Sequence, residues 1–157
     1  MTMRADESRL RFAAARIARL ATVSAEGVPH LVPVVFALRL DAVYLSVDAK
    51  PKTTRHLRRL ANIASTGRVS LLVDHYSEDW AQLWWVRVDG LAEVLADGSE
   101  ESVMAIDALV EKYEQYSRAR PGGPAVAVRD LRWRGWSADT PPERSPRLSN
   151  PNRPGCR

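Results

Sequence analysis

Three stretches of the chain repeat hydrophobic residues every three or four positions, which is the spacing of an amphipathic helix. In residues 4–20 arginines separate the apolar positions, and the expected buried stripe is Leu10, Ala13, Ala14, Ile17 and Leu20. Residues 52–64 predict a shorter helix that ends before Gly67 and buries Leu57, Leu60, Ala61 and Ala64, with Arg55, His56, Arg58 and Arg59 covering the remainder. Residues 98–116 predict the main C-terminal helix, with its apolar side formed by Val103, Ile106, Leu109, Val110 and Tyr113.

Runs of alternating or β-branched residues between turn signals predict six strands. They cover residues 20–24, 30–38, 43–47, 68–76 and 82–95, and a last strand or bulged strand over 125–128 and 131–136. Gly27 in the first link favours a hairpin, and Gly90 marks a bulge or bend in the fifth strand. Pro33 has no N–H to donate, so the second strand is expected at a sheet edge or with a bulge that a cofactor can approach.

Short links make these strands mostly antiparallel, with one helix between the third and fourth strands and one before the last. We therefore predict a mainly β, α+β fold: a six-stranded small barrel capped by helices. The chain has no dinucleotide-binding Gly-x-Gly-x-x-Gly, no phosphate-binding P-loop and no Gly-x-Ser-x-Gly nucleophile elbow. Residues 1–138 form the expected domain, and the Pro- and Arg-rich residues 139–157 are expected to be disordered because they bury too little apolar surface.

Composition and charge exclude several classes of protein. The chain of 157 residues is one domain's worth, and its longest apolar run, Leu31–Leu38, is far shorter than the roughly 20 residues that a membrane helix needs. With no signal peptide at its start, a soluble cytoplasmic protein is expected. The net charge is +4, of which the tail holds half, and no repeat interleaves aromatic and basic residues, so nucleic acid is not an expected partner.

Neither a metal nor a catalytic side chain is predicted. The single cysteine, Cys156, excludes an internal disulfide or a cysteine cluster, and His30, His56 and His75 do not share the spacing of a zinc site. No nucleophile triad is visible. Any redox chemistry would therefore be carried by a cofactor.

The segment from Ser46 to the start of the predicted second helix is the best candidate for anion binding. The first amides of a helix lack internal partners and lie at the positive end of its dipole, and Thr53 or Thr54 can cap them. Full charges and a rigid turn are added by Lys50, Pro51, Lys52 and Arg55. A phosphate fits this pattern, and the alternative is an ordinary threonine cap among solvated lysines.

Trp84 and Trp85 are adjacent on a predicted strand, so they point to opposite faces and only one of them can lie in the core. The other is free to cover a partner subunit or to stack on the ring of a ligand, because a large aromatic group contributes contact area at little entropic cost. Both roles are compatible if the ligand lies between two subunits.

Over about residues 8–138, the order of these pieces resembles the split β-barrel flavin and deazaflavin proteins that include pyridoxamine phosphate oxidases. The resemblance rests on the hairpin of residues 21–30, the strand end and helix start of residues 46–55, and the pattern Val86–Gly90. It implies an FMN-binding-like split barrel, a homodimer and a cofactor at the subunit interface. Lys52 matches the lysine that holds the cofactor phosphate, with Lys50 and Thr53 beside it.

Two departures separate this chain from the oxidases themselves. Trp84–Trp85 stands where they carry an Arg-Gln pair, and their C-terminal substrate-phosphate motif is not evident in residues 131–138. Pyridoxamine oxidation is therefore not expected. Residues 50–57, 74–76 and 83–87 look more like an actinobacterial subgroup assigned as F420-dependent, and the tail of F420 adds negative charges that would favour extra cations at Arg55, Arg58 and Arg59. FMN would accept these cations as well.

The resemblance implies hydride transfer between coenzyme F420 and a small organic acceptor in a homodimer. Val34 and Val35 would face the ring, Lys50, Lys52 and Thr53 would anchor the phosphate, and Trp84 or Trp85 would wall the pocket. Two alternatives stay open: an FMN-dependent reductase or oxidase, and a non-catalytic carrier of flavin, F420 or haem.

Overall fold

The computed structural model describes residues 1–47 and 54–138, with the side chains of residues 54–57 excepted. The predicted tail, residues 139–157, lies outside the described residues. In chain order the elements are α1 (Ala5–Ala14), β1 (Ala18–Val23), β2 (Pro29–Val34), β3 (Ala37–Arg39), β4 (Ala42–Ser46), α2 (Thr54–Thr66), β5 (Arg68–His75), the 3-10 helix η1 (Trp80–Gln82), β6 (Trp84–Val94), α3 (Glu100–Lys112), α4 (Glu114–Arg118) and β7 (Ala125–Ser137).

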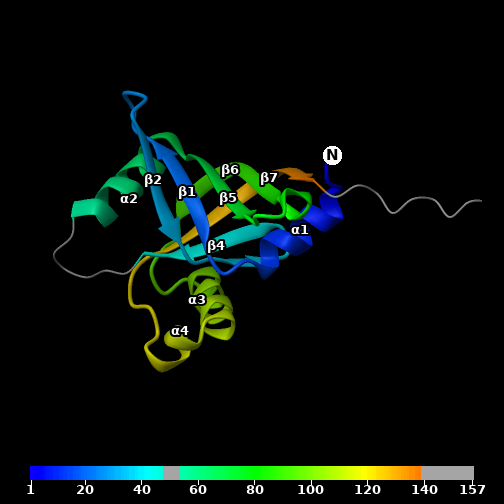
Figure 1. Ribbon diagram of the computed structural model, residues 1–157. Coiled ribbons are helices and arrows are strands. Elements are labelled where there is room, and N and C mark those ends of the chain that lie inside the picture. Colours follow the sequence, from blue (N-terminus) through cyan, green and yellow to red (C-terminus); the bar gives the residue numbers. More distant parts are fainter. Residues whose placement is uncertain (48–53, 139–157) are drawn as a thin grey trace, which may run out of the picture.

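The strands form one curled sheet in the order β2-β1-β5-β6-β7-β4-β3, and every pair in it is antiparallel. Helices α1 and α2 lie at opposite ends of this half-barrel, while α3 and α4 pack beside β4 (Figure 1). The concave side holds the main core, whose fully buried side chains include Leu20, Leu45, Leu71, Val86, Val88 and Val128. The predicted mainly β, helix-capped barrel is thus confirmed.

Two glycine and proline predictions are confirmed by the sheet. Pro33 lies on β2, which is an edge strand. At Gly90 the register shifts, so that Asp130 and Leu131 on β7 oppose that one residue of β6, and Asp130 has a φ of 52°. A Cβ on Gly90 would lie 2.7 Å from the carbonyl oxygen of Arg129, which explains why glycine occupies the bulge.

The predicted strand over residues 30–38 is wrong, because it is broken into β2 and β3. At the break, the N–H of Phe36 donates to the Tyr113 hydroxyl at 3.1 Å, and the Phe36 carbonyl oxygen lies 2.9 Å from the same hydroxyl. The Tyr113 side chain, at the end of α3, thus bonds to the backbone groups of Phe36 that would otherwise pair with a neighbouring strand. The described part of the sheet has seven strands rather than the six predicted.

The predicted helix over residues 4–20 is too long, since α1 ends at Ala14 and β1 begins at Ala18. Leu10, expected in the buried stripe, is 73% exposed, and Ile17 is exposed as well. Phe12 is buried instead and packs against the rings of Phe36 and Trp133. Pairing of β1 on both sides, with β2 and β5, draws residues 18–23 into the sheet and ends the helical pattern early.

The other two predicted helices are also corrected in detail. In α2, Ala61 and Ala64 are exposed, while Arg59, Asn62 and Ile63 are buried. Asn62 Nδ2 donates to Thr22 Oγ1 at 3.0 Å, and this buried polar pair sets which side of α2 faces β1. The helix predicted over residues 98–116 breaks at Tyr113 into α3 and α4.

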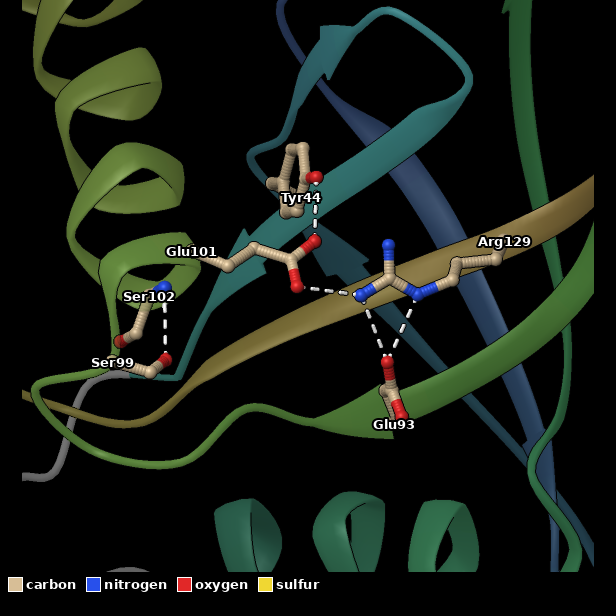
Figure 2. Close-up of polar contacts among 6 residues, drawn as sticks. All are labelled: Tyr44, Glu93, Ser99, Glu101, Ser102 and Arg129. Atoms are coloured by element: carbon tan, nitrogen blue, oxygen red, sulfur yellow. Dashed lines mark hydrogen bonds and ion pairs between the residues drawn. The ribbon is translucent and has the colours of Figure 1, made fainter.

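Helix α3 is fixed to the sheet by a polar network around its first turn (Figure 2). Ser99 caps the helix by accepting from the Ser102 N–H at 3.2 Å. Glu101 accepts from the buried Tyr44 hydroxyl at 2.9 Å and from Arg129 at 2.7 Å, and Arg129 also pairs with Glu93 at 2.9 Å. The network lies on the convex side of the barrel, where α3 covers β3, β4 and the first half of β7.

Candidate functional site

The convex side of β2, β1, β5, β6 and the second half of β7 has no helix packed on it among the described residues; we call it the open face. The strand register aligns its residues in rows across the sheet. One row is Pro33, Arg19, Leu72, Arg87 and Arg134, and a second runs through Asp74, Trp85 and Trp136.

Apolar and charged groups alternate on the open face. Leu31 is 66% exposed, and Leu72 and Trp136 are each 36% exposed. Arg19 pairs with Asp74 at 2.7 Å, and Arg87 pairs with Asp89 at 3.1 Å. Exposed apolar groups bracketed by ion pairs are typical of a surface that contacts another molecule.

The two tryptophans occupy opposite faces, as the alternation predicts. Trp84 packs against the core, where its ring is stacked on His75 with the centroids 6.1 Å apart. The Arg11 guanidinium lies 5.2 Å from the centroid of the Trp84 ring. Trp85 lies on the open face and lines a cavity of about 310 Å³ together with Thr2, Met3, Ala5, Ser8, Trp133, Arg134, Gly135 and Trp136.

Three predicted site residues lie at one end of the sheet. Pro33 is exposed at the end of β2, Val34 is buried in the core, and Val35 is half-buried in the break before β3. The pairing of β3 with β4 begins at Ala37 and Tyr44, and Val35 and Ser46 each lie two residues beyond that pair, at the same end of the hairpin. The Val34 side chain points into the core, so only its backbone is available to a ligand.

Ser46 ends β4 and is buried, and its Oγ has no hydrogen-bond partner within the described residues. Four of the predicted cofactor-binding residues, Lys50, Pro51, Lys52 and Thr53, lie outside the described residues, as does the side chain of Arg55. An unsatisfied buried hydroxyl is costly, so Ser46 is a candidate for contact with a bound polar group.

The structure does not bring Trp84 or Trp85 to Val34 and Val35 within one chain. Strands β1 and β5 lie between β2 and β6. Three strand spacings of about 4.8 Å separate the end of β2 from the tryptophans by about 14 Å. Within one subunit the two groups therefore lie on separate parts of the sheet.

Sequence reasoning missed the burial of Arg59. It was expected on the solvated side of its helix, but only 8% of the residue is exposed, and its Nε has no acceptor among the described residues. Burial lowers the pKa of this guanidinium. Neighbouring Arg58 is exposed, so the two arginines cannot play the same role.

A second cavity, of about 350 Å³, opens at the break between β2 and β3. Its lining consists of Arg16, Val35, Tyr113, Gln115 and Tyr116. Only Val35 of these was a predicted site residue. The pattern analysis placed Tyr113 in the buried stripe of one continuous helix and therefore missed the turn that carries the cavity wall.

The described part of the chain holds neither a metal-binding cluster of side chains nor a helix that could span a membrane. No group of three or more His, Cys, Asp or Glu side chains there is arranged to hold a metal ion. No helix among the described residues combines the length and the apolar character needed to cross a bilayer.

Residues 5–137 match the sequence model of the family described as pyridoxamine 5'-phosphate oxidase. The chain belongs to this family. The match covers nearly all of the described residues, including the open face and the edge at Val35 and Ser46. No curated protein matches the sequence significantly.

Solved structures share the fold at low sequence identity. An FAD-binding protein of Mesorhizobium loti superposes with a TM-score of 0.67 at 22% identity, over 86% of this chain and 95% of its own. HutZ, the heme storage protein of Vibrio cholerae, gives a TM-score of 0.62 at 17% identity, over 84% and 96%. An FAD-binding protein of Mycobacterium smegmatis gives 0.60 at 18% identity, over 87% and 98%. These likenesses establish the fold.

Proposed function

We propose that this protein is a homodimer that binds coenzyme F420 between its subunits and transfers a hydride between the deazaflavin and a small organic acceptor. The observation that carries the proposal is the separation of the two halves of the site. Val35 directly follows β2 and the ring of Trp85 lies on β6, and strands β1 and β5 separate β2 from β6 in the sheet.

A second copy packed on the open face would resolve this separation, because its Trp85 could approach the Val35 edge of the first. The exposed Leu31, Leu72 and Trp136 supply apolar area for such packing. The face also carries both signs of charge, in the pairs Arg19–Asp74 and Arg87–Asp89. A surface of mixed charge can therefore be complementary to itself.

The described residues fit a phosphate-bearing cofactor at one point. The buried Ser46 Oγ lacks a partner among them and stands at the end of β4, next in the chain to the segment that carries Lys50, Lys52 and Thr53. A phosphate oxygen would accept from this hydroxyl, and the lysines would balance its charge. The unpartnered Nε of buried Arg59 is a further cation on the helix that follows.

The chain's own part in the reaction is binding and exclusion of water. When bound, the cofactor supplies the hydride, and the acceptor takes up that hydride together with one proton. Val35 and the backbone at Val34 present an apolar edge to the ring, and Trp85 of the second subunit closes the other side. Closing the groove excludes water from the reacting groups.

The test is a parallel fluorescence titration of the purified protein with F420, FMN and hemin at fixed ionic strength. The proposal expects F420 to bind most tightly, with affinity lost when dilution dissociates the dimer. Turnover with reduced F420 and an acceptor then separates an enzyme from a carrier. Tighter binding of FMN would establish the flavin alternative, and tight binding of hemin without turnover would establish the haem carrier.

A pair of variants tests the phosphate assignment. Lys52→Ala is expected to weaken F420 binding about ten- to hundredfold, the usual effect of losing a charge-assisted hydrogen bond. Arg58→Ala removes the same charge from an exposed position on α2 and is the matched control, with a small expected effect. Equal affinities of the Lys52 variant and the parent would remove lysine 52 from the site.

A further inference from the structure

The cavity at the break between β2 and β3 has the size of a small-molecule site. Its volume is about 350 Å³, within the range in which small ligands are held. Two tyrosine rings, Tyr113 and Tyr116, meet edge to face with their centroids 6.1 Å apart, and Val35 adds an aliphatic wall. The lining is therefore mostly flat and apolar, with Arg16 as its one charged group among the described residues.

Arg16 is held in place by a backbone hydrogen bond and an aromatic ring rather than by a carboxylate. Its Nη1 donates to the carbonyl oxygen of Lys112 at 2.8 Å, and its guanidinium carbon lies 4.6 Å from the centroid of the Tyr113 ring. Neither contact neutralises it, and no carboxylate pairs with Arg16 among the described residues. The guanidinium has five N–H donors, so most of them remain available on a group whose orientation is already fixed.

A second cation lies directly behind the first. Lys112 Nζ donates to the carbonyl oxygen of Ala15 at 2.8 Å and lies 3.9 Å from the centroid of the Phe36 ring. It too has no carboxylate partner within the described part of the chain. Burial, and after it the charge of Arg16, lower the pKa of Lys112 to about 8.

We propose that this cavity binds a small, flat organic acid, with the carboxylate on Arg16 and the planar body between Val35 and the rings of Tyr113 and Tyr116. A guanidinium presents two parallel N–H groups that match the two oxygens of a carboxylate. The aromatic walls favour a flat body over a bulky one. As the binding site of the hydride acceptor, the assignment rests on the proposed function; as an acid-binding site it stands on the cavity alone.

The experiment uses benzoate and its neutral analogue benzamide as probes of the full-length protein without cofactor, followed by NMR titration at fixed ionic strength. Benzoate is expected to bind at least tenfold more tightly than benzamide. Arg16→Gln is expected to weaken benzoate binding about ten- to hundredfold and to leave benzamide binding unchanged. The resonance of the Lys112 side chain is a second readout, because an anion beside it should raise its pKa above about 8.

The matched control is Arg118→Gln. Arg118 lies nearby on α4, is exposed, and pairs with Glu114, so the variant changes the net charge equally without touching the cavity lining. If Arg16→Gln does not fold, Arg16→Lys keeps the charge but loses the paired N–H groups, and an intermediate benzoate affinity is expected. Equal binding of benzoate and benzamide, or equal losses in the Arg16 and Arg118 variants, would overturn the proposal.

Titration of the same variants with F420 separates the two proposals. Benzoate binding that depends on Arg16, in a protein that does not bind F420, would keep the acid site and overturn the deazaflavin function. Binding of F420 by a protein that binds benzoate and benzamide equally would keep the deazaflavin function and overturn the acid site.

Discussion

The hydroxyl of Tyr113 is bonded to both backbone groups of Phe36, accepting from its N–H at 3.1 Å and lying 2.9 Å from its carbonyl oxygen. The same hydroxyl is 3.0 Å from the carbonyl oxygen of Arg16. Tyr113 is buried at the junction of α3 and α4, so one side chain joins the helical layer, the break in the sheet edge and the link before β1.

Tyr113→Phe is expected to lower the free energy of unfolding by about 1 to 3 kcal/mol, because it leaves buried backbone groups of Phe36 without a partner. Urea denaturation at fixed protein concentration measures this loss. Tyr76→Phe is the control, since the Tyr76 side chain is exposed and its hydroxyl donates to the exposed Glu78 carboxylate. Similar stabilities of the two variants would mean that the Tyr113 hydroxyl is dispensable.

Because of Lys112, we expect the free energy of unfolding to rise at alkaline pH. Its pKa is about 8 in the folded protein, below the ordinary 10.5, so between these values the unfolded chain binds the additional proton. The penalty for burying the charged amine is complete below pH 8 and disappears as pH rises through this window. Relative to Lys112→Met, the wild type should gain about 1 to 2 kcal/mol, less than the full shift implies because the amine is only half-buried.

Urea denaturation of both proteins at pH 7.5 and 10 measures that gain. Groups other than Lys112 titrate equally in the two proteins and cancel in the difference. A difference that stays constant with pH would show that Lys112 keeps an ordinary pKa.

The two carboxylates that pair with Arg129 are expected to contribute differently to the free energy of unfolding. Glu101→Ala also removes the acceptor of the buried Tyr44 hydroxyl, so we expect a loss of about 1 to 3 kcal/mol. Glu93→Ala leaves Arg129 paired with Glu101 on a more exposed surface and should cost about 0 to 1 kcal/mol. Thermal unfolding of both variants decides the order, and a larger effect at Glu93 would contradict this assignment.

Gly135 predicts a steric coupling between β7 and α1. A methyl group there would overlap Ser8 Oγ and lie 3.0 Å from Met3 Cβ, so Gly135→Ala should destabilise the protein by about 1 to 3 kcal/mol. Adding Ser8→Ala should recover part of the loss. Gly122→Ala meets no atom within 4 Å and is the control. Calorimetric melting of the parent, the two single variants at positions 8 and 135, the double variant and the control tests the coupling, and additive effects of the Gly135 and Ser8 changes would exclude it.

Ser46→Ala is expected to weaken cofactor binding without lowering the stability of the protein. Removing a buried hydroxyl that has no partner among the described residues should leave the stability of the cofactor-free protein unchanged or slightly higher. Affinity for the phosphate-bearing cofactor should fall by about 0.5 to 1.5 kcal/mol. Thermal melting and cofactor titration of the same preparation measure both quantities, and unchanged affinity would remove Ser46 from the phosphate site.

Local sequence patterns predicted the features that residues close together in the chain determine. Alternation identified β5 and β6 and the opposite faces of Trp84 and Trp85. The lack of an N–H at Pro33 limited its strand to a sheet edge or a bulge, and β2 is an edge strand. The patterns failed where a distant partner decides. Phe36 is lifted out of its strand by a residue 77 positions away, and α2 is oriented by the contact of Asn62 with Thr22 across 40 positions.

The candidate site shows the same division. The predicted Val35 does line a cavity, but its companions Arg16, Tyr113 and Tyr116 come from separate stretches whose periodicity indicated only buried helix faces. No spacing within either stretch reports that the two meet. The open face likewise becomes visible only when the register of five strands is known.

The position of Tyr113 has a consequence for how such a chain can diverge. Tyr113 is bonded to the break in the sheet edge at Phe36, whereas Gln115 and Tyr116 of the cavity lining stand in the short α4, outside the sheet. Insertions or substitutions within Glu114–Arg118 can therefore reshape the mouth of the cavity while the strands keep their register. The ligand preference of such a protein can therefore change during evolution while its fold stays the same.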